Sequence, residues 1–303
     1  MNSYSVYAII INWNGKFDTS ECLASLSNVH HDNPFLHVVV VDNHSTDGSL
    51  IEIKRKFPWV HCIAAEKNLG FSGGNNKGIL YALEQHADIV WLLNNDTVVD
   101  TKVLSALNAF KDSSVGAVGS KIYFYKGCEF HKNRYTLKDL GHVLWYAGGI
   151  IDWKNMMASH RGVDEVDRGQ FNKQIETGFI TGCSYFIRTD ILKKVGYLDE
   201  SYFMYMEDLD LSFRIQHAGY KTVYNPASIV WHKNASSSGG SGSGTHEYYQ
   251  TRNRLKIGMK YAPLRTKIAL IREAVRFCLY GSKLKRKAVF DWALGNMGTF
   301  HEA

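Results

Sequence analysis

The chain of 303 residues lacks an apolar run of the ~18 residues that would cross a bilayer. No basic stretch precedes residues 7–11, which are therefore predicted to form a first strand and not a signal peptide. The five cysteines are scattered and unpaired in spacing, which disfavours a disulfide framework or a zinc site and favours a reducing compartment. The glycine-rich dinucleotide fingerprint is also missing, which argues against a nicotinamide or flavin site. These absences favour a cytoplasmic protein.

The composition, 45% hydrophobic and 21% charged, is that of a globular protein with a substantial core. The net charge of +6 is unevenly distributed along the chain. From Arg252 onward there are 12 lysines and arginines against three acids, whereas the preceding residues hold 23 against 26. The positive charge therefore belongs to the C-terminal tail.

Strand-like and helix-like segments alternate through the first third of the chain. The predicted strands lie at 6–11, 37–41, 62–64, 89–93 and 115–120, and the helices at 19–27, 48–56 and 74–85. Further segments are predicted as a helix from Thr101 and as one strand over 177–188 with two glycine interruptions, whereas 121–174 shows no clear periodicity. Near-continuous apolar strands in β-α alternation favour a mostly parallel sheet covered by helices on both faces.

Polar residues follow three of these segments in succession. Asp42 and Asn43 end one strand, Asn94, Asn95 and Asp96 end another, and a glycine- and asparagine-rich loop spans 68–78. Ligands of open α/β sheets bind at the carboxyl ends of the strands, so these loops predict a polar ligand or metal site. The alternatives are that Asp96 caps the next helix and that Asp42 only stabilises a turn.

Three further groups of residues have side chains suited to catalysis or to ligand binding. Glu207 and Asp208 begin a predicted helix, where the helix dipole alone would favour one acid. His232 ends an apolar run, as either a core-edge histidine or a metal ligand. Arg252 and Arg254 have the fork geometry that suits phosphate oxygens.

These residues lie in motifs that occur together in one known family. The motifs are VVVVDNHSTDGS, NLGFSGGNN, LLNNDT, TGCSYFIR, YFMYMEDLDLSFR, WH at Trp231 and His232, and YYQTRNRL. In this order, over residues 7–261, the chain resembles the inverting glycosyltransferases of family 2, most closely their bacterial rhamnosyltransferase-like branch.

The resemblance implies a GT-A (Rossmann-like) fold, a nucleotide-sugar donor and a divalent cation, Mg²⁺ or Mn²⁺. Asp208 matches the catalytic base with Glu207 as its partner. Asp96 matches the last acid of the metal-binding D-x-D motif, and His232 a histidine that completes the metal site in some relatives. The first position of that motif is Asn94 here, which leaves one fewer charge at the metal. The implied donor-binding residues are Asp42, Asn43, Asn68, Gly70, Asn75, Asn94, Asn95, Arg252 and Arg254.

The predicted organisation is a GT-A catalytic domain over 1–235, a flexible Gly/Ser loop with a diphosphate-binding segment over 236–262, and a basic helical tail over 263–303. The loop is predicted to act as either a tether or a lid. The tail alternates apolar and basic residues at helical spacing. It therefore predicts either peripheral contact with the inner face of the plasma membrane or a helix packed on the domain with a solvated basic face.

The expected activity is transfer of a sugar, with dTDP-rhamnose as the leading donor, to a glycan acceptor in bacterial polysaccharide or O-antigen assembly. An acceptor built on a lipid carrier fits the basic tail, and no nucleic-acid partner is expected. The alternatives are a UDP-hexose or galactofuranose transferase of the same family, and an inactive nucleotide-sugar or glycan-binding protein.

Overall fold

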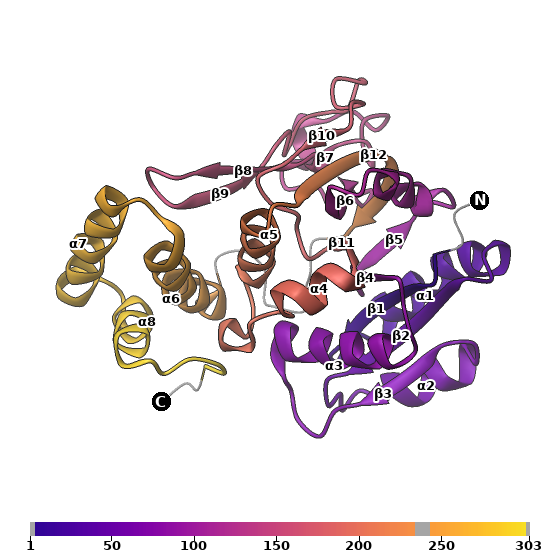
Figure 1. The fold of residues 1–303 in the computed structure, drawn as a ribbon, viewed down its shortest axis with the longest axis horizontal. Helices are drawn as coiled ribbons and strands as arrows, with labels where there is room; N and C mark the ends of the chain where they lie inside the picture. Colours follow the sequence, from indigo (N-terminus) through magenta and orange to yellow (C-terminus); the bar gives the residue numbers. More distant parts are fainter. Residues whose placement is uncertain (1–3, 234–242, 301–303) are drawn as a thin grey trace.

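The computed structural model describes residues 4–233 and 243–300 (Figure 1). A central sheet runs in the order β10, β12, β6, β11, β4, β1, β2, β3, with β5 paired to β12 and β7 to β6, and β8 and β9 form a separate hairpin. The strands are β1 (Val6–Asn12), β2 (Leu36–Asp42), β3 (His61–Ala64), β4 (Ile89–Asn94), β5 (Thr97–Val99), β6 (Val115–Phe124), β7 (Leu144–Tyr146), β8 (Gly149–Asp152), β9 (Met157–His160), β10 (Ile175–Glu176), β11 (Ser184–Arg188) and β12 (Lys221–His232).

The sheet is mostly parallel, as predicted. Strands β3, β2, β1 and β4 are parallel to one another, and β12 is parallel to β6. Strand β11 lies between these two groups and is antiparallel to both β4 and β6. Asn12 pairs with Asp42 and Ile11 with Asn94, so the carboxyl ends of β1, β2 and β4 meet at one edge.

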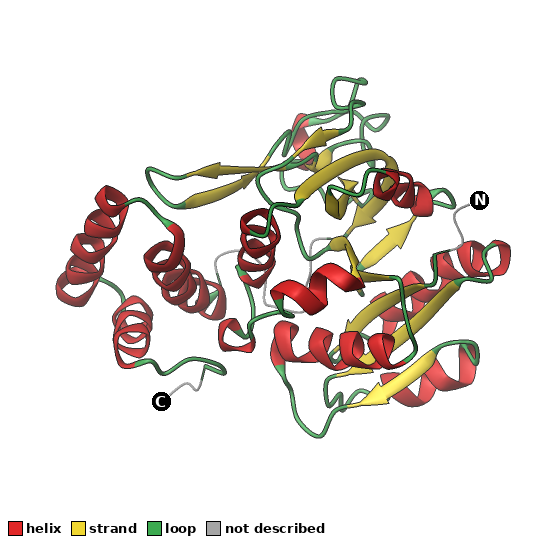
Figure 2. Ribbon diagram, in the orientation of Figure 1, coloured by secondary structure: helices red, strands yellow, loops and turns green. Residues whose placement is uncertain are grey.

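Helices cover both faces of the sheet (Figure 2). They are α1 (Lys16–Asp32), α2 (Ser49–Lys56), α3 (Gly70–Glu84), α4 (Thr189–Val195), α5 (Glu207–His217), α6 (Gly244–Tyr261), α7 (Leu264–Tyr280) and α8 (Lys283–Leu294), with 3₁₀ turns η1 (Val103–Lys111), η2 (Lys132–Arg134) and η3 (Glu200–Tyr202). Alternate residues of β1, β2 and β4 pack against α1 and α2 on one face and against α3 and α4 on the other. Both faces are therefore buried, which explains the near-continuous apolar runs.

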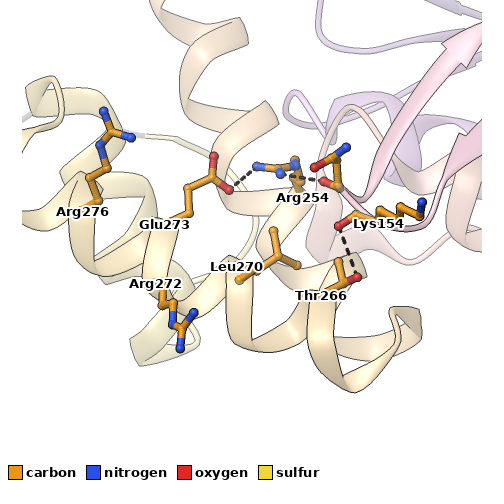
Figure 3. Close-up of a pocket in the computed structure, with 9 residues that line it drawn as sticks. Lys154, Arg254, Thr266, Leu270, Arg272, Glu273 and Arg276 are labelled. Carbon is orange, nitrogen blue, oxygen red and sulfur yellow. Dashed lines mark hydrogen bonds and ion pairs between the residues drawn. The ribbon is translucent and has the colours of Figure 1, made fainter.

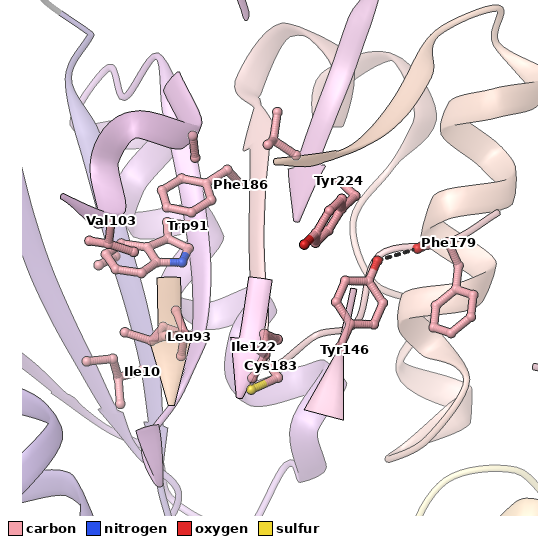
Figure 4. Packing of buried hydrophobic residues seen from close by; sticks show 14 of the residues in the cluster. Ile10, Trp91, Leu93, Val103, Ile122, Tyr146, Phe179, Cys183, Phe186 and Tyr224 are labelled. Carbon is pink, nitrogen blue, oxygen red and sulfur yellow. Dashed lines mark hydrogen bonds between the residues drawn. The ribbon is translucent and has the colours of Figure 1, made fainter. Parts of the chain in front are cut away.

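The core on the face of the sheet that α1 covers contains several packed aromatic side chains. The rings of Trp91 on β4 and Phe186 on β11 stack with centroids 4.6 Å apart, and Tyr146 donates a hydrogen bond to the carbonyl oxygen of Phe179 (Figure 4). The Trp91 indole N–H donates to Ser184 Oγ, which satisfies the polar atom of this buried ring. These contacts attach the antiparallel strand β11 to the parallel part of the sheet.

Three segments differ from their predictions. The strand predicted over 177–188 is confined to Ser184–Arg188, because residues 177–183 form a loop in which Gly182 packs closely against the Phe71 ring. The helix predicted from Thr101 is the 3₁₀ turn η1. The segment without periodicity contains the end of β6 and the short strands β7, β8 and β9.

Helices α6, α7 and α8 pack on one another at one margin of the molecule (Figure 1). The predicted Gly/Ser loop lies outside the described residues as far as residue 242. Within the described ranges, no helix combines the length and apolarity needed to span a membrane.

Candidate active site

A cavity of about 560 Å³ opens where β1, β2 and β4 end. Six of the residues predicted for the site line it: Asn43, Asn68, Gly70, Asn94, Asn95 and Asp96. They come from three segments that are far apart in the sequence, and the parallel register brings them together at the predicted edge of the sheet.

The wall beside β2 is fixed by side-chain hydrogen bonds to the backbone of Gly70. Asn43 donates to the Gly70 carbonyl oxygen at 2.8 Å, and the Gly70 N–H donates to Asn68 Oδ1 at 2.8 Å. Gly70 has a φ of +70°, and a Cβ there would lie 2.5 Å from the carbonyl oxygen of Phe203. Both the left-handed backbone and the close approach of Phe203 therefore require glycine at this position.

Asp96 and His232 come together at the ends of β4 and β12. His232 Nε2 lies 3.1 Å from Asp96 Oδ1, and both residues are buried. The 3₁₀ turn η1 begins only at Val103, and Asp100 accepts a hydrogen bond from the Lys102 N–H at 2.8 Å just before it. Asp96 is thus positioned by His232 and does not cap the next helix.

The Asp96–His232 pair has the chemistry of a cation site. Within the described part of the chain, neither ring nitrogen of His232 makes a hydrogen bond, and Nε2 is the one that faces Asp96; an orphaned buried nitrogen favours a ligand or ion. A carboxylate oxygen and an imidazole nitrogen suit Mg²⁺ or Mn²⁺. Among the described residues no three His, Cys, Asp or Glu side chains converge on such a site, so a cation would need further ligands from outside this set.

Glu207 and Asp208 begin helix α5, as predicted. Asp208 Oδ2 accepts from the Gly182 N–H at 2.9 Å and Oδ1 from the Leu209 N–H at 2.8 Å. Gly182 also packs against Phe71, which lines the cavity, so Asp208 lies directly behind this wall.

Burial shifts the two acids of α5 in the same direction. It raises the pKa of Glu207 well above its ordinary value, and the neighbouring Asp208 charge adds to this shift. It also raises the pKa of Asp208, although the N–H groups of Gly182 and Leu209 oppose the rise. Like-charge repulsion thus raises the pKa of Glu207 less than burial does. Asp210 is instead neutralised by Arg214 and Lys260, each at 2.7 Å.

The two arginines predicted to hold the donor pyrophosphate do not line the cavity. Arg252 is fully buried and donates to the carbonyl oxygens of Ser201, Tyr202 and Gly298. Arg254 lines a different cavity, where it pairs with Glu273 at 2.6 Å (Figure 3). In this conformation both guanidinium groups are fully engaged within the protein.

Asn253 completes the contacts that Arg252 makes with the loop before α5. Its amide donates to the carbonyl oxygens of Tyr202, Met204 and Tyr205. This loop needs such support because Phe203, Tyr205 and Met206 have φ values of +64°, +66° and +72°. We call Arg252 and Asn253 the α6 clamp, since they hold the loop that leads into the α5 acids.

The remaining predicted residues lie beside the cavity but do not line it. Asp42 is buried and accepts from the Asn12 amide at 2.7 Å and from the Ser45 N–H at 3.0 Å. It therefore stabilises the turn after β2, as the alternative interpretation anticipated. The Asn75 amide donates to the Phe71 carbonyl oxygen within α3.

Sequence reasoning missed the apolar side of the cavity. The lining residues outside the prediction are Ile11, Trp13, Phe71, Leu93, Phe203, Met204, Ser243, Thr245, Tyr249, Thr299 and Phe300. Trp13 directly follows β1, so the strand-end rule could have found it. No sequence pattern near Phe300 could have predicted its position, because it reaches the cavity through a tertiary hydrogen bond from its N–H to the Tyr249 hydroxyl.

Solved structures share this fold. The mannosyltransferase PcManGT from Pyrobaculum calidifontis, in complex with GDP-Man and Mn²⁺, has a TM-score of 0.56 at 16% identity, covering 98% of this chain and 76% of its own. GalNAc-T7, with UDP, GalNAc and Mn²⁺, has a TM-score of 0.66 at 16% identity, covering 99% of this chain and 55% of its own. The fold is therefore that of the GT-A glycosyltransferases.

Sequence comparison identifies the glycosyltransferase family of the chain. The model of the family described as "Glycosyltransferase like family 2" matches residues 4–254, so the chain belongs to this family and is a glycosyltransferase. An N-acetylglucosaminyl-diphospho-decaprenol L-rhamnosyltransferase of Mycobacterium tuberculosis is 27% identical over 227 residues, 72% of each chain. The dTDP-rhamnosyl transferase RfbF of Shigella flexneri is 26% identical over 150 residues, 47% of this chain and 48% of its own. The predicted resemblance to rhamnosyltransferases is confirmed.

Replacing Glu207 by Gln tests the buried acid. When folding raises the pKa of a carboxyl, the full stabilising contribution is present at pH values below the pKa of the unfolded chain, about 4.3. This contribution is lost as the pH rises through the higher pKa of the folded protein. We therefore expect Glu207→Gln to melt at least about 2 °C above the parent at pH 8, with a smaller difference at pH 5. Thermal unfolding across this pH range measures the effect.

The matched control for Glu207 is Asp210→Asn in the same helix. This change should lower the melting temperature throughout the range, because Arg214 and Lys260 lose their carboxylate partner. A Glu207→Gln protein that melts below the parent at pH 8 would contradict the assignment of Glu207 as an unfavourably buried acid.

Arg252→Lys tests the α6 clamp. A lysine ammonium cannot span carbonyl groups from two separate segments as the planar fork does, so we expect a loss of about 2 kcal/mol or more of unfolding free energy. Denaturant unfolding measures this loss, with Arg254→Lys as a control. There the lysine keeps its charge opposite Glu273 at a partly exposed site and loses only the contacts with the adjacent carbonyl groups of Asn155 and Met156. An unchanged stability combined with weaker nucleotide binding would show that Arg252 contacts the donor instead.

Proposed function

We propose that this glycosyltransferase transfers rhamnose from dTDP-rhamnose, with inversion at the anomeric carbon, to a glycan acceptor in bacterial polysaccharide or O-antigen assembly. The observation that carries the proposal is the convergence of Asp96 and the strand-end amides in one cavity, with Asp208 directly behind its wall. The named activities of the relatives from Mycobacterium tuberculosis and Shigella flexneri support rhamnose as the sugar.

The proposal includes a divalent cation at Asp96 and His232. When bound, the cation would neutralise the diphosphate of the donor and make the nucleoside diphosphate a better leaving group. Asn94 lies in the same cavity but contributes no charge, so the donor phosphates would balance more of the charge of the cation. The imidazole of His232 favours Mn²⁺ over Mg²⁺, because Mg²⁺ prefers oxygen ligands.

Asp208 is the general base of the proposed reaction. It takes the proton from the acceptor hydroxyl while the hydroxyl oxygen attacks the anomeric carbon from the side opposite the leaving diphosphate. Asp208 receives two backbone N–H bonds that favour its carboxylate form, whereas Glu207 Oε2 has no hydrogen-bond partner among the described residues. We therefore assign the base to Asp208, whose carboxylate form these N–H groups stabilise, and the partner role to Glu207.

A lipid-linked acceptor is part of the proposal. The relative from Mycobacterium tuberculosis is named for an acceptor that carries a diphospho-decaprenol group. Such an acceptor stays at a membrane, so we place this enzyme at the inner face of the plasma membrane, in contact with it through the basic C-terminal helices.

The donor and the cation are tested by calorimetry with a panel of nucleotide sugars, with Mn²⁺ and with a chelator. We expect dTDP-rhamnose to bind best and only with the metal, and Asp96→Ala to abolish the metal-dependent part of the affinity. Asp100→Ala, which changes a carboxylate outside the cavity, is the control. A preference for a UDP-hexose or a galactofuranose donor would overturn the choice of sugar, and affinity unaffected by metal in both proteins would overturn the cation site.

The base is tested by Asp208→Asn. The amide keeps the size of the side chain but cannot accept a proton, so turnover should fall by about 10²-fold or more while donor affinity stays near that of the parent. Asp190→Asn, at an exposed position of α4, is the matched control and should retain full turnover. A near-normal rate in Asp208→Asn would exclude this role, and donor binding without turnover in the parent would favour a nucleotide-sugar-binding protein.

A further inference from the structure

We propose that helix α7 binds the surface of an anionic lipid membrane. The inference deepens the proposed function. It rests on that function only for the biological reason of the membrane contact, which would be to bring the enzyme to a lipid-linked acceptor. It is carried by an apolar stripe along α7, which consists of Leu264, Ile268, Ile271, Val275 and Leu279.

The α7 stripe is exposed along the whole helix. Its residues have between 45% and 74% of their surface accessible, and they recur at intervals of four, three, four and four residues. At about 100° per residue this spacing keeps all five on one narrow face. The helix buries a different face, through Thr266, Leu270 and Ala274. Helix α7 therefore has one apolar face against the protein and a second apolar face without cover among the described residues.

Basic side chains flank the α7 stripe on both sides. Arg265, Arg272 and Arg276 follow one edge and Lys267 the other, and within the described ranges none of the four forms an ion pair with a carboxylate. The one acid of α7, Glu273, is directed at Arg254, whereas Arg272 and Arg276 extend away from this ion pair (Figure 3). The surface around the stripe is therefore positively charged without internal compensation.

The neighbouring helix α8 extends the same charge. It carries Lys283, Lys285, Arg286 and Lys287, of which Lys285 pairs with Glu247 of α6 and Lys287 with Asp291, the one acid of α8. Phe290 and Leu294 of α8 are also exposed, at 56% and 72%. Both helices thus combine exposed apolar side chains with a surplus of cations, at the outer margin of the molecule (Figure 1).

The charges favour a lipid surface over a second copy of the chain as the occupant. Two α7 stripes packed on each other in a symmetric dimer would bring basic rows of both copies together, and like charges across an interface oppose association. An anionic membrane accepts apolar side chains between its headgroups and attracts the flanking arginines at the same time. With its 17 residues, α7 would lie in the plane of the membrane surface.

The test is flotation of the full chain with vesicles of phosphatidylcholine alone or of phosphatidylcholine mixed with phosphatidylglycerol. We expect binding to the mixed vesicles only, weakened by salt. The double variant Ile271→Asp with Val275→Asp should lose at least about tenfold in vesicle affinity, and Arg272→Gln with Arg276→Gln should lose the preference for anionic vesicles. No nucleotide or sugar is needed, so the result is independent of the donor.

Two matched controls change similar residues elsewhere. Leu137→Asp alters an exposed leucine in the segment between β6 and β7, and Lys132→Gln with Arg134→Gln removes two cations there, and both should bind vesicles like the parent. Circular dichroism and thermal unfolding establish that each variant is folded. Equal vesicle binding by the folded α7 variants and the parent would overturn the proposal. A concentration-dependent dimer that the double variant Ile271→Asp with Val275→Asp abolishes, without vesicle binding, would overturn it in favour of a second copy.

Discussion

The α6 clamp is the contact on which the site depends. One buried guanidinium and one amide hold carbonyl groups of the loop over 201–205, whose left-handed residues cannot be stabilised by helix or sheet hydrogen bonds. The loop supplies Phe203 and Met204 to the cavity wall, and the Phe203 carbonyl accepts the N–H groups of Phe71 and Ser72 at the start of α3. The glycine-rich loop and the acids of α5 are thus set in place by side chains of a helix that follows them in the sequence.

The acids of the chain have different roles because their surroundings differ. Asp210 is held between two cations and keeps α5 attached to α6, whereas Glu207 in the same turn is buried and its Oε2 has no hydrogen-bond partner in the described part of the chain. Asp208 is intermediate, because it accepts from two backbone N–H groups and forms no ion pair among the residues that the structure describes. A run of acids in a sequence therefore does not identify the base; the hydrogen-bond partners of each carboxylate do.

The sequence predicted what depends on local pattern. Strand ends are visible as apolar runs that stop, and parallel register then brings Asn43 and Asp96 to one edge. The direction of β11 could not be predicted, since a buried strand is equally apolar in a parallel or an antiparallel pairing. The hydrogen-bond partners of Arg252 could not be predicted from the sequence either. An arginine fork suits phosphate and carbonyl oxygens alike, and only the tertiary structure shows which oxygens surround it.

Residues beyond the family match, which ends at residue 254, also line the cavity. Arg252 donates to the carbonyl oxygen of Gly298, and this contact brings Thr299 and Phe300 to the cavity. The same helical group presents the α7 stripe at its outer margin. Helix α7, which carries the stripe, packs on α6, which lines the cavity through Thr245 and Tyr249. Attachment of α7 to a membrane would therefore fix the orientation of the cavity relative to the lipid. An acceptor anchored in that lipid would then approach the base from a restricted set of directions, which reduces the entropic cost of positioning its hydroxyl group.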